Sequence, residues 1–259
     1  MPQIILFARL AALPENPFMN VAAPAQRYQW LFFDADGTLF DFEKSQAAAL
    51  AQVFRHHGIP YDPMHLATFR GINAELWRAL EQGRVTPDIL KVRRFELLLA
   101  TVGAKHAPEP FSEIYLQYLG ACPELICGAD GLLRTLRSKH RIAILTNGLK
   151  KVQRRRLERS AIRDYISEII VSEEIGHAKP AREYFDVAFA RTGNPAKHAV
   201  LMIGDSWTSD MQGAAQYGID TCWYNPGRQP RPGSPAITHE IATLEELPLW
   251  LGAAHGEGK

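Results

Sequence analysis

The sequence has few cysteines, no excess of charge of either sign and no long hydrophobic run. Its 259 residues include three cysteines, Cys122, Cys127 and Cys222, which are too few for a disulfide framework. We therefore expect free thiols, a reducing compartment and a cytoplasmic location. No second cysteine or histidine pair at matching spacing accompanies Cys122 and Cys127, so small buried or part-buried thiols are favoured over a metal site.

The charged residues nearly cancel, since 29 lysines and arginines face 28 aspartates and glutamates, for a formal net charge of +1. A nucleic-acid backbone attracts proteins with an excess of positive charge, so we expect no nucleic-acid partner. No apolar run approaches the ~20 residues that span a bilayer, so we expect no membrane partner. We expect a globular protein that is a monomer or a weak homo-oligomer.

The start of the chain does not resemble a secretory signal. Residues 4–13 are apolar but interrupted by Arg9, and no basic residue precedes them, whereas an exported protein has a charged segment before a cleaner apolar stretch. We expect residues 1–27 to form a poorly ordered tail or a short appended helix outside the active core. Met19 is an alternative start of translation.

Short apolar runs alternate with helical patterns over much of the chain. The runs lie at 30–33, 142–145, 168–172, 199–204 and 220–224, and the helical patterns at 129–139, 150–160, 181–192 and 209–217. Short, continuously apolar strands are typical of a parallel sheet that is covered on both faces. The alternation with helices predicts right-handed crossovers and a doubly wound α/β fold.

Residues 43–127 interrupt this alternation with helical patterns at 44–57, 65–82, 86–102 and 110–120. Thr86 followed by Pro87 is typical of a helix start, with a capping side chain and a proline in the first turn. We therefore predict an all-helical cap at 43–127, inserted into a core made of 28–42 and 128–259, with 1–27 as the tail.

Polar side chains follow the predicted strands where each strand ends. They are Asp34 and Asp36, Thr146 and Asn147, Lys179, and Asp205 and Asp210. Ligands of open α/β sheets bind beyond the carboxyl ends of the strands. Any one of these carboxylates has the alternative role of capping a helix or accepting from loop amides. Together they would repel one another without a cation, and oxygen ligands of this kind suit Mg²⁺.

These residues resemble the four motifs of the haloacid dehalogenase (HAD) superfamily, in the same order along the chain. The motifs are Asp34-Ala-Asp36-Gly37-Thr38-Leu39, Thr146, Lys179, and Gly204-Asp205 followed by Asp210. The resemblance covers residues 28–250 and implies a HAD-like core with an inserted cap. The segments WLFFDADGTLF, SEEIGHAKP and VLMIGDSWTSD are most similar to the pyrimidine 5′-nucleotidase subgroup.

The resemblance implies a phosphoryl transfer through an aspartyl-phosphate. Asp34 would attack phosphorus, and Asp36 would protonate the leaving oxygen and then deprotonate the attacking water. Thr146 would offer its hydroxyl, Asn147 its backbone amide and Lys179 its charge to the phosphate.

The same resemblance implies Mg²⁺ as the cofactor. Its ligands would be Asp34, the backbone carbonyl of Asp36, and Asp205, while Asp210 would bind through water or orient Lys179.

The second aspartate distinguishes between the reactions of the superfamily. Its dehalogenases lack this residue and its P-type ATPases carry threonine there, so Asp36 indicates a phosphatase or a phosphomutase. We expect a Mg²⁺-dependent phosphomonoester hydrolase acting on pyrimidine nucleoside monophosphates such as UMP, dUMP and dTMP. The alternatives are a phosphatase of a small metabolite such as phosphoglycolate or a sugar phosphate, a phosphomutase, and a catalytically silent binding protein.

Substrate-selecting residues are harder to identify than catalytic ones. In the predicted cap, Asn73, Trp77 and Arg94 are candidates for contacts with a base or sugar, although residues at helical spacing are more often part of a core. The basic run from Lys150 to Arg159 has acidic residues nearby, and we interpret it as the solvated face of a helix.

Overall fold

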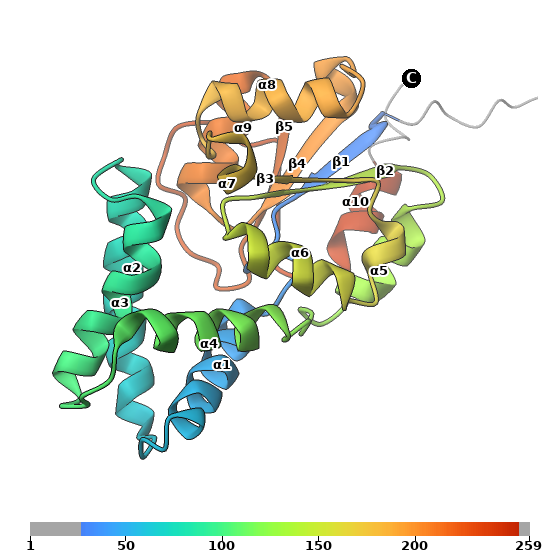
Figure 1. Cartoon of the computed structure of the whole chain (residues 1–259). Helices are drawn as coiled ribbons and strands as arrows, with labels where there is room; N and C mark the ends of the chain where they lie inside the picture. Colours follow the sequence, from blue (N-terminus) through green and yellow to red (C-terminus); the bar gives the residue numbers. More distant parts are fainter. Residues whose placement is uncertain (1–26, 254–259) are drawn as a thin grey trace, which may run out of the picture.

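The computed structural model describes residues 27–253 (Figure 1). The predicted tail therefore lies outside the described residues except for Arg27, and so does Met19. Within the described part of the chain, no helix is long and apolar enough to cross a membrane.

Six parallel strands form one sheet in the order β3-β2-β1-β4-β5-β6. Their bounds are β1 Trp30–Phe33, β2 Arg141–Thr146, β3 Glu168–Val171, β4 Val200–Gly204, β5 Asp220–Tyr224 and β6 His239–Ile241. The chain proceeds from β1 to one edge and then returns to β4 and continues to the other edge. The predicted doubly wound sheet is thus confirmed, with its topological switch point between β1 and β4.

Helices cover both faces of this sheet, as Figure 1 shows. α5 (Ala129–Leu136) and α10 (Glu246–Ala253) pack on the face that receives Leu31 and Phe33. α8 (Arg182–Arg191) and α9 (Gly213–Tyr217) pack on the face that receives Trp30 and Phe32. Because successive side chains of a strand point to opposite faces, the short run of β1 contributes to both cores.

Four helices inserted between β1 and β2 build a separate core beside the carboxyl end of the sheet (Figure 1). They are α1 (Phe42–His56), α2 (Pro63–Glu81), α3 (Pro87–Thr101) and α4 (Pro108–Gly120). The side chain of Thr86 accepts from the backbone N–H of Ile89 at the start of α3, as its capping role predicts. The inserted helical cap is confirmed, while its boundaries at 43 and 127 stay a prediction.

One further helix, α6 (Lys150–Glu158), joins the two parts of the molecule. Its Leu157 belongs to the core on the face of the sheet that α5 and α10 cover, whereas its Val152 packs with the aromatic core of the cap. Because α6 contacts both cores, its side chains lie where the cap and the sheet meet.

Several elements were not predicted. Among them are β6, α10, the single-turn helix α7 (Ser172–Ile175), and a π-helical turn over Trp207–Gln212 that precedes α9. The predicted helix at 209–217 is therefore regular only in its second half. A π turn has a wider backbone than an α-helix and frequently occurs at functional sites; here it contains Asp210.

Candidate active site

The loop after β1 brings two aspartates to the switch point of the sheet. Asp34 continues the strand pairing, because its backbone N–H donates to the carbonyl of Ile203 at 2.9 Å. The loop then turns at Gly37, whose φ of +87° is favourable for glycine. A Cβ at this position would lie 2.6 Å from Oδ2 of Asp205. Glycine thus allows the loop to approach the end of β4 closely.

Lys179 is the centre of a buried ionic network. Its Nζ donates to Oδ1 of Asp34 at 2.6 Å, to Oδ1 of Asp210 at 2.7 Å and to the backbone carbonyl of Leu145 at 2.7 Å. All three ammonium hydrogens therefore have acceptors. Burial acts to lower the pKa of Lys179, but the carboxylates of Asp210 and Asp34 raise it above its usual value. The charged form of Lys179 is consequently favoured between two carboxylates.

Asn147 holds the Lys179 loop in place through a pair of hydrogen bonds. Its side-chain Nδ2 donates to the carbonyl of Lys179 at 2.9 Å, and its Oδ1 accepts from the N–H of Lys179 at the same distance. The hydroxyl oxygen of Thr146, the preceding residue, is buried and accepts from the N–H of Gly148 at 3.0 Å. The Asn147 side chain thus positions Lys179, a contact that sequence reasoning missed.

Three carboxylates form a group that is able to hold a metal ion. Asp34, Asp205 and Asp210 each offer an oxygen, and these oxygens all lie within 4.8 Å of one another. Burial raises the pKa of Asp34 well above its usual value, and burial with the nearby Asp210 raises that of Asp205 to about 6. One lysine does not compensate three carboxylates, so the group suits a hard divalent cation such as Mg²⁺.

The side chain of Asp36 lies outside this group and points to α6. Its Oδ2 accepts from Nε2 of Gln153 at 2.5 Å, and its Oδ1 accepts from Nη1 of Arg156. A Cβ on Gly148 would lie 2.0 Å from Nε2 of Gln153. The hydrogen bond from Gln153 to Asp36 therefore depends on the absence of a side chain at position 148.

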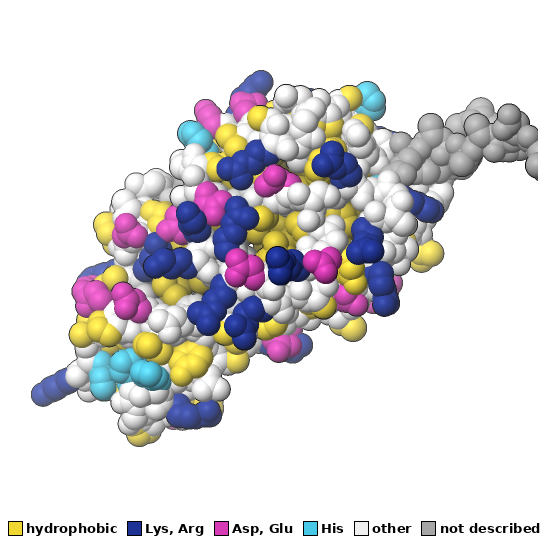
Figure 2. Space-filling model, turned by 45° about the vertical axis from the view of Figure 1, so that its right-hand side comes forward, with side chains coloured by type: hydrophobic (Ala, Val, Ile, Leu, Met, Phe, Trp, Pro, Cys, Tyr) yellow, Lys and Arg dark blue, Asp and Glu magenta, His cyan; other side chains and the backbone are white. Residues whose placement is uncertain are grey.

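The interpretation of the basic run as a solvated face is wrong for Arg156. This side chain is fully buried and pairs with Asp36, because its part of α6 faces the junction of cap and sheet. Arg154 lies nearer to solvent and pairs with Glu174 at 2.6 Å. Figure 2 shows basic and acidic side chains interspersed on one face of the molecule.

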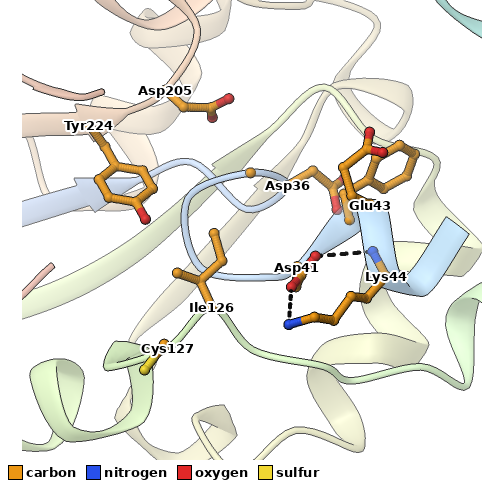
Figure 3. A pocket seen from close by; sticks show the side chains of 10 residues that line it. Asp36, Asp41, Glu43, Lys44, Ile126, Cys127, Asp205 and Tyr224 are labelled. Carbon is orange, nitrogen blue, oxygen red and sulfur yellow. Dashed lines mark hydrogen bonds and ion pairs between the residues drawn. The ribbon is translucent and has the colours of Figure 1, made fainter. Parts of the chain in front are cut away.

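A pocket of about 520 Å³ opens beside the loop after β1 (Figure 3). Asp36 and Asp205 approach it from the ends of β1 and β4, and Tyr224 from the end of β5. The two chain segments that connect the core with the cap complete the wall. The first segment carries Asp41 and Lys44, which form an ion pair, and the second carries Cys127. The pocket therefore reaches Asp205 of the carboxylate group.

The three candidate residues of the cap also lie together. Asn73 and Arg94 are buried and joined by a hydrogen bond of 3.1 Å between Oδ1 and Nη1. Trp77 and Arg94 line a narrow cavity with Asp36 at the junction of cap and core. Asp36 thus lies between this cavity and the open pocket.

The sequence matches the haloacid dehalogenase-like hydrolase family over residues 28–218. It is 37% identical over 222 residues to the Bacillus subtilis protein named "Putative HAD-hydrolase YfnB", covering 86% of this chain and 94% of that one. It is 33% identical over 221 residues to pyrimidine 5′-nucleotidase YjjG of Escherichia coli, covering 85% and 96%. Pyrimidine 5′-nucleotidase PynA of Streptococcus pneumoniae is 29% identical, covering 85% and 93%.

Solved structures are similar to the whole described fold. The magnesium-bound crystal structure of YfnB superposes with a TM-score of 0.82 at 37% identity, covering 87% of this chain and 99% of that one. L-2-haloacid dehalogenase of Xanthobacter autotrophicus superposes with a TM-score of 0.69 at 17% identity, covering 87% and 98%. The second likeness shows a shared fold only.

Proposed function

The chain belongs to the haloacid dehalogenase-like hydrolase family, and on that premise we propose that it hydrolyses pyrimidine nucleoside monophosphates with the help of Mg²⁺. UMP, dUMP and dTMP are the proposed substrates. The observation that carries the proposal is the buried network in which Lys179 bridges Asp34 and Asp210 beside Asp205. The names of YjjG and PynA support the choice of pyrimidine nucleotides.

In the first step, Asp34 acts as the nucleophile. An oxygen of its carboxylate forms a bond to phosphorus while the bond from phosphorus to the leaving oxygen breaks. Lys179 holds the other carboxylate oxygen, Oδ1, at 2.6 Å and so fixes the direction of attack. The hydroxyl of Thr146 and the backbone N–H of Asn147 donate to the phosphate oxygens. The positive charge of Lys179 offsets the negative charge of these oxygens.

Asp36 carries the proton in both steps. It gives a proton to the leaving oxygen, and later takes one from the water that attacks the aspartyl-phosphate and releases inorganic phosphate. In the structure both of its oxygens accept hydrogen bonds, from Gln153 and Arg156. This arrangement suits the ionised form that the second step requires. For the first step one of these oxygens must carry a proton.

The residues at the end of the sheet fit a magnesium ion, because every donor is an oxygen and the carboxylates outnumber the lysine. Asp34, Asp205 and the backbone carbonyl of Asp36 would hold the ion, and Asp210 would bind it through water. When bound, Mg²⁺ would offset the negative charge of the carboxylates and the phosphate. The presence of magnesium in the YfnB structure supports this choice.

Release of phosphate from a panel of esters tests the proposal. The panel contains UMP, dUMP, dTMP, CMP, AMP, phosphoglycolate and several sugar phosphates, each with Mg²⁺ and with a chelator. Asp34→Asn enzyme, purified in the same way, measures contaminating phosphatase. We expect Mg²⁺-dependent release that is fastest for the pyrimidine nucleotides. A preference for a sugar phosphate would contradict the proposed substrate and retain the proposed chemistry.

One observation favours a second substrate class, the small anionic metabolites. Arg94 and Arg156 both line the cavity beside Asp36, and Asp36 is its one acidic residue. A carboxylate at the far end of a small phosphate ester, as in phosphoglycolate, would neutralise the remaining positive charge. The same panel decides between this class and the nucleotides.

A further inference from the structure

A narrow cavity lies between the cap and the core, next to the proposed general acid. Trp77 and Arg94 line it from the cap, and Gln153, Arg156 and Asp36 line it from the core. Its volume of about 20 Å³ has room for one water molecule. The cavity must widen before it can take a larger group.

Arg94 is buried in this cavity wall without a carboxylate partner. The residue is 2% exposed, and none of the ion pairs between residues 27 and 253 includes it. Its Nη1 donates to Oδ1 of Asn73, whereas its Nε and Nη2 have no hydrogen-bond partner within the described chain. An uncompensated buried charge with unsatisfied donors is costly.

The orientation of the Arg94 guanidinium is set by aromatic rings. Its Cζ lies 5.0 Å from the ring centre of Tyr115, 5.1 Å from that of Phe95 and 5.9 Å from that of Phe69. Such contacts stabilise the cation without using its N–H groups. The two unpartnered nitrogens, Nε and Nη2, carry N–H bonds on the same edge of the planar group, and such an edge binds two acceptors or one shared oxygen.

Arg156 differs from Arg94 in one decisive way. Its Nε and Nη2 also lack partners, but its Nη1 pairs with Asp36, so its charge is compensated. Only Arg94 brings an uncompensated positive charge to the cavity from the cap side. Asp36, the proposed general acid, lines the same cavity, so a group that enters it would lie on the side of the ester oxygen that Asp36 protonates. That group is the leaving group and not the phosphate.

We propose that Arg94 is a specificity-determining residue whose Nε–H and Nη2–H donate to oxygen acceptors of the leaving group, while the neighbouring Trp77 provides a flat apolar surface. This inference rests on the proposed function, and within it the acceptor is the ring carbonyl that every pyrimidine carries at C2. A carboxylate of a small metabolite offers the same oxygen chemistry, and the experiment separates the two sources.

The test compares kcat/KM of Arg94→Met and Arg94→Lys on UMP, CMP, phosphoglycolate and phenyl phosphate. Phenyl phosphate has a flat leaving group without an acceptor beyond the ester oxygen. For Arg94→Met we expect a loss of ~10- to 100-fold on the preferred acceptor-bearing ester, because a buried hydrogen bond to a charged group is lost. Phenyl phosphate should change by less than about three-fold, and Arg94→Lys should fall between wild type and Arg94→Met.

Arg93→Met is the matched control, because Arg93 lies on the same helix with an exposed side chain that pairs with Glu96. It should leave all four substrates unchanged. The melting temperature adds a readout that separates recognition from packing. Arg94→Met removes an unpaired buried charge but also the hydrogen bond to Asn73 and the ring contacts, so its melting temperature should stay within a few degrees of the wild type.

Three results would overturn the role of Arg94. They are an equal loss on phenyl phosphate, no loss on any acceptor-bearing ester, and a wild type that hydrolyses phenyl phosphate as well as the other esters. A wild type that prefers phosphoglycolate would contradict the pyrimidine assignment alone. In that case the role of Arg94 is still tested, through the loss on phosphoglycolate relative to phenyl phosphate.

Discussion

Two clusters of buried polar side chains among residues 27–253 differ in how completely their hydrogen bonds are satisfied. At the end of the sheet, every hydrogen of the Lys179 ammonium has an acceptor, and Asn147 fixes its backbone. At the junction of cap and core, Nε and Nη2 of Arg94 and Arg156 and the hydroxyl of Tyr115 have no partner within the described chain. The first cluster has more carboxylates than cations, and the second has more hydrogen-bond donors than acceptors.

This difference indicates a division of labour. A catalytic group acts best when its geometry is fixed before the substrate arrives, because no reorganisation is then needed at the moment of reaction. A recognition group gains selectivity when its donors are left unpaired by the wrong ligand. The cluster around Lys179 at the end of the sheet (the sheet cluster) therefore suits the common chemistry of the family. The cluster around Arg94 and Arg156 at the junction of cap and core (the cap cluster) suits the choice of leaving group.

Asp34→Asn is the substitution with the largest expected effect on the sheet cluster. The amide cannot attack phosphorus, so we expect phosphate release to fall by at least ~1,000-fold on every substrate. Asp210 remains as a carboxylate partner of Lys179, so the melting temperature should stay within a few degrees of the wild type. Asp88→Asn, at an exposed position of α3, is the control and should keep full activity. Activity above a few per cent of wild type would exclude Asp34 as the nucleophile.

Asp36→Asn probes the residue that follows the nucleophile closely in the sequence but contacts the cluster at the junction of cap and core. We expect turnover of nucleotides to fall by about 100- to 10,000-fold, because the leaving oxygen receives no proton. An activated ester such as 2,4-dinitrophenyl phosphate needs no proton on its leaving group, so it should still form phosphoenzyme. Acid quenching and phosphoprotein detection measure that step. Equal losses on both esters would contradict the role of Asp36 as the acid.

The sheet cluster was largely predictable because its residues follow strands that the sequence reveals. Continuous apolar runs end directly before Asp34, Thr146 and Asp205, and parallel strands place such residues at one edge. β6 was missed because His239–Ile241 contains no apolar run. The π turn around Asp210 was missed because a helical pattern does not distinguish a π turn from an α-helix.

The cap cluster was less predictable because its contacts join segments that are distant in the sequence. Gln153 and Arg156 belong to a helix rich in basic residues, and only the approach of the Asp36 loop gives them a buried partner. Arg94 was a candidate contact, but its spacing on the helix equally suited a core position. Its unpaired Nε and Nη2 become visible only when the surrounding rings and Asn73 are in place.

Gly148→Ala tests how strongly the helix at the junction controls Asp36. The new Cβ would displace Nε2 of Gln153, which lies 2.0 Å from its position. We expect kcat on nucleotides to fall by about 3- to 10-fold through loss of one hydrogen bond to Asp36. Gly131→Ala, in α5 with open space around it, is the control and should keep kcat while stability is unchanged or higher. Identical kcat values for both variants would show that Gln153 does not position Asp36.

The smallest expected effect is a pH dependence of stability that the sheet cluster produces and the cap cluster does not. Burial raises the pKa of Asp205 from 3.8 to about 6, so between these values the folded protein binds a proton that the unfolded chain does not bind. This contribution to stability is present at low pH and is lost as pH rises through about 6. Without Mg²⁺, the melting temperature should therefore be a few degrees higher at about pH 5 than at about pH 7.5.

Asp205→Asn should reduce this difference, whereas Arg94→Met should leave it unchanged. Mg²⁺ binds the ionised carboxylates and should stabilise the wild type more at the higher pH. A wild type whose melting temperature falls on acidification as much as that of Asp205→Asn would contradict the raised pKa of Asp205.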